Sequence, residues 1–190
     1  MRYTRVIVAA LIAAAPTASA QRIESFGPEI RPFVGAYIPT SDHSNDFKAA
    51  TMVGAQGAFE LSENFHFVSS VSWALGHNKF AGYSTDNTNI WAYDVGGEMN
   101  LVNEITDNWF LKPFVGLGAG GRTYDYRARG VGTKTCTTGY GALGTEFQSG
   151  LVALRFEARD YLSCFQSPVT GKRQTRNDAA FTFGLAYHVR

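Results

Sequence analysis

Eight segments of this chain alternate apolar with polar or small residues at a period of two, and this pattern constrains the fold more than any other feature. In Ala179–Val189, for example, Phe181, Phe183 and Leu185 share one face. A period of two is typical of β-strands. The predicted strands are Ile30–Pro39, Thr51–Leu61, Phe65–Gly76, Asn89–Leu101, Trp109–Tyr126, Thr138–Phe147, Leu151–Leu162 and Ala179–Val189.

The connections between these strands are short and long by turns. Residues 62–64, 102–108 and 148–150 form the short connections. The long and polar connections are residues 40–50, 77–88, 127–137 and 165–178. Short turns at one rim and long loops at the other are typical of a transmembrane β-barrel, whose short turns face the periplasm. Strands of roughly 9 to 12 residues also match a tilted span of the hydrocarbon layer.

Alternation alone does not say whether the apolar face meets lipid or a dry core, and a soluble lipocalin-like barrel would show the same period. Two features favour lipid. The polar face is rich in Gly and Ala with a few charges, as a narrow interior requires. The apolar face carries aromatic residues towards strand ends, as interfacial girdles do: Trp91, Tyr93, Trp109 and Tyr187. We therefore predict an all-β fold, an eight-stranded antiparallel up-and-down transmembrane β-barrel.

The first twenty residues have the pattern of an export signal. Arg2 and Arg5 precede an apolar run from Val6 to Ala15, which is too short to span a bilayer as a helix. Ala18-Ser19-Ala20 is a small-x-small cleavage site. We predict a signal peptide over residues 1–20 and one barrel domain over residues 21–190.

The charge balance excludes a nucleic-acid partner. The chain has 17 Lys and Arg against 16 Asp and Glu, and removal of the signal peptide takes away two arginines and no acid. The mature chain therefore has a net charge near −1, which gives no basic field for nucleic acid.

Charged residues on the polar face predict an ion network inside the barrel. Arg155, Glu157 and Arg159 occupy alternate positions, so they point to the same side, and charges do not face hydrocarbon cheaply. Further inward candidates are Glu146, Glu98, Glu60, Asp94 and Lys112. Because an eight-stranded barrel is just wide enough for side chains to fill it, we expect this network to plug the lumen. The alternative is a gate or a proton path.

The motif Arg31–Gly35 (RPFVG) recurs four strands later as Lys112–Gly116 (KPFVG). The repeat either marks equivalent positions in two halves of the barrel or reflects a proline tolerated where a strand enters from the periplasmic rim. We favour the second interpretation.

Three motifs carry a resemblance to a known family: Arg31–Gly35, Arg155–Tyr161 and Phe181–Tyr187. With them the chain resembles the eight-stranded outer-membrane β-barrel family that includes the transmembrane domain of outer membrane protein A. The resemblance covers the whole mature chain. It implies a place in the outer membrane of a Gram-negative cell and insertion by the barrel assembly machinery, which reads the last strand. That signal usually ends on an aromatic residue, whereas this sequence ends on Arg190. No peptidoglycan-binding domain is expected to follow.

The two cysteines flank the sixth and seventh predicted strands. The residue numbers of two positions that pair across a hairpin add up to a constant. Residues 136 and 164 are equally far from residue 150, so they would pair in a hairpin whose turn is centred on residue 150. If the turn is tight and centred there, Cys136 and Cys164 lie opposite each other at a distance that suits a disulfide. We predict this bond; two unbonded thiols are the alternative.

We predict that the protein is not an enzyme. Some barrels of this size modify lipid A, which needs a nucleophilic serine activated by a histidine and an acid. His43 lies beside Ser44 and Asp42 in a loop, and such residues are usually turn formers. The other histidines are expected at the barrel rims: His66, His77 and His188. No metal-binding or nucleotide-binding motif occurs, so no cofactor is expected.

The function predicted from the sequence is a structural or surface-interaction role, with the long loops carrying any recognition. Basic residues in the third and fourth long loops form a rim that could bind lipopolysaccharide phosphates: Arg127, Arg129, Lys134, Lys172, Arg173 and Arg176. Ordinary solvated charge is the slightly favoured interpretation of this rim. We expect a monomer in outer-membrane lipid. The alternative function is a small transport or ligand-binding barrel.

Overall fold

The computed structural model describes residues 27–40, 48–62, 64–77, 79, 87–101, 103–106, 109–126, 132–166 and 173–189. Nearly all of these residues are in β-strands. None of them belongs to a helix long and apolar enough to cross a membrane. The signal peptide predicted over residues 1–20 lies outside the described residues.

The described residues form eight long strands and one short one. The long strands are β1 (Glu29–Pro39), β2 (Ala50–Ser62), β3 (Phe65–His77), β4 (Asn87–Asn100), β6 (Trp109–Tyr126), β7 (Lys134–Ser149), β8 (Val152–Gln166) and β9 (Arg173–His188). The short strand β5 (Asn103–Thr106) pairs with the start of β6, in a connection for which the sequence predicted no strand.

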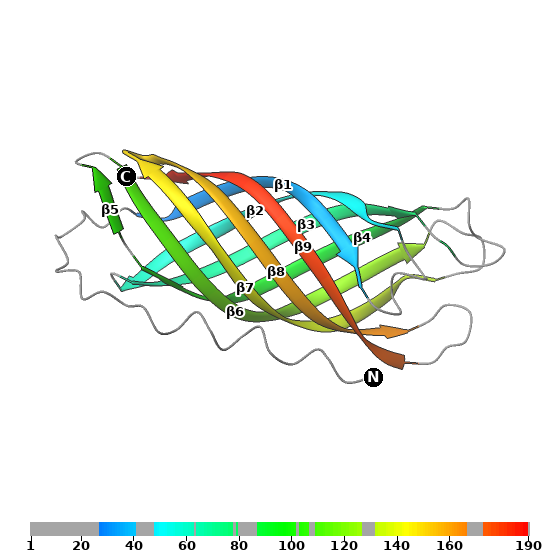
Figure 1. Cartoon of the computed structure of the whole chain (residues 1–190). Coiled ribbons are helices and arrows are strands. Elements are labelled where there is room, and N and C mark those ends of the chain that lie inside the picture. Colours follow the sequence, from blue (N-terminus) through cyan, green and yellow to red (C-terminus); the bar gives the residue numbers. More distant parts are fainter. Residues whose placement is uncertain are drawn as a thin grey trace, which may run out of the picture.

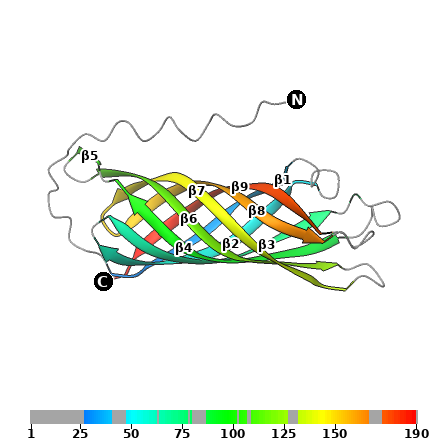
Figure 2. The same ribbon diagram turned by 90° about the horizontal axis from the view of Figure 1, so that it is seen from below.

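The eight long strands form a closed antiparallel barrel. Each pairs with its neighbours in the sequence, β4 pairs with β6, and β1 pairs with β9 to close the ring. Figures 1 and 2 show the strands wrapped around one cylinder and inclined to its axis. This confirms the predicted fold class. Closure matters because it leaves no strand edge with unpaired backbone groups.

The two ends of the barrel differ. At one end, Glu29 pairs with His188, and the β2–β3 and β7–β8 turns are short. We call this end the turn end and the opposite one the loop end. Several strands run further than predicted at the loop end, because β7 begins at Lys134 and β9 begins at Arg173. Lys134, Arg173 and Arg176 therefore lie in strands, which corrects their assignment to long loops.

The alternation of the sequence sorts side chains between two surfaces. Large apolar side chains on the outer face are strongly exposed, among them Val115, Leu117 and Phe181. Charged side chains such as Arg31 and Glu146 are buried on the inner face. A soluble protein would have the opposite arrangement, because exposed apolar area is costly in water. The barrel therefore has the surface of a protein immersed in lipid.

The β7–β8 hairpin shows how register fixes which face a side chain occupies. Ser149 pairs with Val152 across a two-residue turn, and Gly150 in that turn has a φ of 62°. Glycine adopts this left-handed conformation without steric cost, which suits a two-residue hairpin turn. The residue numbers of each β7–β8 pair therefore add up to 301, whereas a pair between Cys136 and Cys164 would need 300.

This register contradicts the predicted disulfide, because no bond joins Cys136 and Cys164. Cys136 is buried on the inner face of β7, whereas Cys164 shares the outward-facing alternation of Leu162 on β8. A shift of one residue turns a side chain to the other face of a sheet. The prediction from the sequence failed because it centred the turn on one residue instead of between two.

We therefore expect both cysteines to react as thiols. Protein purified without reductant, unfolded in denaturant and treated with a maleimide should gain two labels per chain, and Cys136→Ser should gain one. A chain that takes up a label only after reduction would show that the cysteines are bonded.

Inward-facing glycines set how closely the strands and side chains pack. A Cβ added at Gly144 would lie 2.2 Å from the backbone oxygen of Phe156 and 2.3 Å from the Phe114 ring. A Cβ added at Gly141, on the outer face of the same strand, would meet only Leu117 at 3.8 Å.

From these distances we expect Gly144→Ala to lower the free energy of unfolding by about 1–3 kcal/mol, because overpacking forces the backbone to shift. Gly141→Ala should change it by less than about 0.5 kcal/mol. Urea titration in lipid vesicles, followed by gel mobility without boiling, measures both. Equal midpoints for the two variants would contradict this account of the packing.

Candidate functional site

The candidate site is the inner surface of the barrel, where eight charged side chains lie in the half nearer the turn end. We call this set the inner network: Glu29, Arg31, Asp94, Glu98, Glu146, Arg155, Glu157 and Arg159. They come from β1, β4, β7 and β8. All are at most 7% exposed, so each charge depends on its neighbours rather than on water for stabilisation.

Arg155 is at the centre of the inner network. Its Nη2 donates to Glu157 Oε2 at 2.8 Å, and its Nη1 donates to Glu98 Oε1 at 3.2 Å and to Glu146. The guanidinium carbon lies 3.6 Å from the centre of the Phe114 ring. The planar guanidinium group has five N–H donors, so one arginine can bind three carboxylates at once.

Arg31 extends the network to the strand on the other side of the barrel closure. Its Nη2 lies 2.6 Å from Glu29 Oε2 and 3.5 Å from Glu146 Oε1, and its Nη1 lies 3.2 Å from Glu98 Oε1. Glu98 and Glu146 are therefore shared between Arg31 and Arg155. Shared carboxylates join the two arginines into one connected cluster.

Arg159 continues the network towards the loop end. It binds Glu157, and its Nη1 lies 3.3 Å from Asp94 Oδ2. Asp94 also accepts a hydrogen bond from the Tyr161 hydroxyl at 2.9 Å. Gln56 on β2 donates from Nε2 to Glu157 Oε2 at 3.2 Å. The contacts of Asp94 and Gln56 cross the lumen, because they connect β4 and β2 with β8, which is not their neighbour in the sheet.

Two residues predicted for the network stand apart from it. Glu60 is on β2, is only partly buried and is paired in register with His66. Lys112 is buried and is opposite Glu146 in register. Within the described part of the chain, neither Glu60 nor Lys112 makes an ion pair with the other predicted members. The structure brings together Arg155, Glu157, Arg159, Glu146 and Glu98.

Glu29 and Arg31 are network members that were not predicted from the sequence. The signal was present, because these residues stand two apart on β1, as Arg155 and Glu157 do on β8. The role of the histidines at the turn end was not predicted either. His188 Nδ1 lies 2.9 Å from Glu29 Oε1, and His66 Nδ1 lies 3.1 Å from Asn100 Nδ2.

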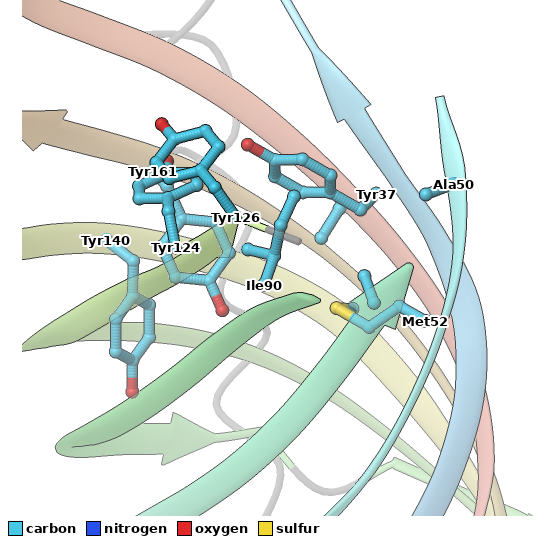
Figure 3. Packing of buried hydrophobic residues seen from close by; sticks show 10 residues of the cluster. Tyr37, Ala50, Met52, Ile90, Tyr124, Tyr126, Tyr140 and Tyr161 are labelled. Carbon is cyan, nitrogen blue, oxygen red and sulfur yellow. The ribbon is translucent and has the colours of Figure 1, made fainter. Parts of the chain in front are cut away.

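A second inner cluster lies in the half nearer the loop end. Arg122 on β6 forms an ion pair with Asp178 on β9 at 2.8 Å. Its guanidinium carbon lies 4.4 Å from the Tyr161 ring centre and 5.0 Å from that of Tyr37. Tyr37 and Tyr161 also belong to the buried hydrophobic cluster whose labelled side chains Figure 3 shows packed together: Tyr37, Ala50, Met52, Ile90, Tyr124, Tyr126, Tyr140 and Tyr161. Cation–π contacts of this kind stabilise a desolvated arginine.

The remaining predicted site residues are scattered. Arg176 is 8% exposed and lies on the inner face of β9, so it cannot be part of an exposed basic rim. Arg127, Arg129, Lys172 and His43 lie outside the described residues. His77 is exposed at the end of β3. In the described ranges, no group of three or more His, Cys, Asp or Glu side chains could hold a metal ion.

Comparison with known proteins agrees with this architecture. Residues 7–188 match the family model described as outer membrane protein beta-barrel domain. The structure is similar to that of Neisserial surface protein A, with a TM-score of 0.67 and 9% identity over 85% of this chain and 97% of the other. It also matches the attachment invasion locus protein of Yersinia pestis, with a TM-score of 0.46 and 13% identity over 86% and 99% of the two chains. No curated protein matches the sequence.

Because Arg155 binds three carboxylates, we expect Arg155→Ala to lower the free energy of unfolding by about 3–5 kcal/mol, as removal of one partner of a buried ion pair does. Glu60→Gln is the matched control and should change it by less than about 0.5 kcal/mol. Urea titration of the refolded barrel in lipid vesicles gives both values. Similar losses for the two variants would mean that burial, and not pairing with Arg155, governs stability.

Proposed function

The chain belongs to the outer membrane protein beta-barrel family, and on that premise we propose that it acts as a plugged, non-enzymatic barrel with a structural or surface-interaction role. The barrel fixes the places from which the connections at the loop end leave the membrane. Rigid scaffolds with variable connections commonly carry recognition in those connections. In this proposal the loop end recognises any partner, and the barrel wall with its inner network holds the loop end in a fixed position.

The observation that carries the proposal is the pairing of charges across the lumen. A conducting pore keeps its charged groups hydrated along a continuous path. Here Arg31, Arg155 and Arg159 are each at most 7% exposed and are bound to carboxylates from other strands. Opening a path would separate these ion pairs in a space with little water, which is costly. The plug is therefore the favoured interpretation of the inner network over a gate or a proton path.

Two of the three described histidines, His66 and His188, have contacts that support a role other than catalysis, whereas His77 is exposed at the loop end of β3. A serine-based lipid-modifying site needs a histidine in contact with its nucleophile. His188 contacts Glu29 and His66 contacts Asn100, both at the turn end. The turn end is the periplasmic side in this proposal, away from outer-leaflet lipid.

Export and assembly complete the proposal. Residues 1–20 would act as a signal peptide that is cleaved after Ala20, leaving residues 21–190 as a monomeric barrel. The barrel assembly machinery would insert it through its last strand. Outer-membrane lipid surrounds the wall, and any contact with lipopolysaccharide would come from the loop end.

We expect the purified barrel to carry no stepwise current in planar bilayers, because the inner network and the Arg122–Asp178 cluster fill the lumen. A general porin in the same bilayers is the positive control. Reproducible current steps from the wild-type barrel would favour the alternative, a small transport barrel, and would rule out the plug.

A further inference from the structure

The β1–β9 seam, where the first and last strands close the barrel, is interrupted. Ile30 pairs with Tyr187, and the next paired residues are Phe33 and Gly184. The two residues between them on each strand, Arg31–Pro32 and Leu185–Ala186, do not pair. The other pairings between long strands run without a break except for an irregularity beside the β2–β3 turn.

Pro32 explains the interruption. Proline has no N–H, so within a sheet it removes one hydrogen bond of the ladder. The repeated motif places Pro113 at the corresponding point of β6, but with a different result. Pro113 pairs with Thr145 in an unbroken β6–β7 ladder, and its oxygen accepts from the Leu101 amide just beyond the end of β4. The same motif is therefore harmless at Pro113 and breaks the ladder at Pro32.

A cavity of about 10 Å³ lies at the interruption. Its lining includes residues of both faces of the wall, with Arg31, Arg155 and Thr182 on the inside and Pro32 and Leu185 on the outside. The cavity therefore lies at the interrupted part of the seam and borders two arginines of the inner network. One water molecule needs a cavity volume of roughly 10–15 Å³, so this cavity is about the size of a single water molecule.

Gln56 is the candidate hydrogen-bonding residue of this cavity. It lines the cavity, is 4% exposed and donates from Nε2 to Glu157. Its Oε1 is buried and accepts no hydrogen bond in the structure. Buried polar atoms are nearly always satisfied, by protein or by ordered water.

We propose that one water molecule binds in this cavity to Gln56 Oε1, and that the hydrated gap beside Pro32 is the place where the barrel wall opens first. The water satisfies Gln56 and also offers hydrogen bonds to the backbone groups that Pro32 leaves without a ladder partner. It exchanges through the gap, so the seam gives solvent its shortest route to Arg31 and Arg155.

Contacts on both sides of the gap keep the opening local. At the turn end, His188 and Glu29 join β9 to β1 at 2.9 Å. At the loop end, the Thr40 amide and hydroxyl donate to the Asn177 oxygen at 3.2 and 2.6 Å. The strands therefore part around Pro32 without separating at their ends.

Hydrogen exchange of the full-length mature chain in lipid nanodiscs tests the opening. In the wild-type barrel, amides of residues 184–187 should exchange faster than those of residues 144–147, which face Pro113 on β7. Pro32→Ala restores an N–H and should slow exchange at residues 184–187 by about fivefold, the effect of one hydrogen bond. Pro113→Ala is the matched control and should leave residues 144–147 unchanged.

Two outcomes would overturn the proposed opening. One is wild-type exchange at residues 184–187 that is no faster than at residues 144–147, and this comparison stands even if Pro32→Ala fails to fold. The other is a folded Pro32→Ala barrel, verified by its heat-dependent gel mobility, in which exchange at residues 184–187 is unchanged.

The bound water is tested separately by nuclear Overhauser effects between water and backbone amides. The amide of Gly184 should show a water contact in the wild-type barrel, and Gln56→Met should abolish it, because methionine keeps the side-chain length and removes the Oε1 acceptor. A wild-type barrel without this signal would refute the water site.

Discussion

Closing a small sheet inside a bilayer imposes one electrostatic constraint on which the rest of this structure depends: the arginines buried on the inner wall must find carboxylate partners on that same wall. Arg155 meets the constraint with carboxylates from β4, β7 and β8, and Arg31 shares two of them. The result is a connected network rather than a set of isolated pairs. Because the barrel is narrow, little water can hydrate the inner charges, so they must form ion pairs. The same narrowness lets side chains on opposite strands reach each other across the lumen.

Much of the fold was predictable because it follows from a local property. A period of two survives in each strand regardless of its neighbours, so the eight long strands and the inward direction of Arg155 could be predicted from the sequence alone. Features that depend on a single residue of register could not. The β7–β8 turn lies between Gly150 and Leu151, and this half-residue difference places Cys136 and Cys164 on opposite faces. The lengths of β7 and β9 also exceeded the prediction, because polar outward residues at the loop end hide the continuation of a strand.

The candidate site was predictable in kind but not in its pairings. Charge type and alternation identified which groups face inward. One partner of Arg31 and one of Arg159, however, lie on β4, several strands away around the ring, and no spacing in the sequence encodes a contact across the lumen. Glu60 and Lys112 lie on the inner face, yet Glu146, the carboxylate opposite Lys112, pairs with Arg31 and Arg155 instead.

The sharing of carboxylates between distant strands has a consequence for how the barrel can be built. The β3–β4 hairpin carries Asp94 and Glu98, and the cations that neutralise them are on β1 and β8. Such a hairpin would bring two bare acids into hydrocarbon if it inserted by itself, at a considerable energetic penalty. Assembly that inserts one hairpin at a time is therefore disfavoured. The strands must enter the membrane interior together, or their charges must be shielded from hydrocarbon during insertion. The inner network thus makes insertion into the bilayer cooperative, because the charges of one hairpin are neutralised only when the other strands are present.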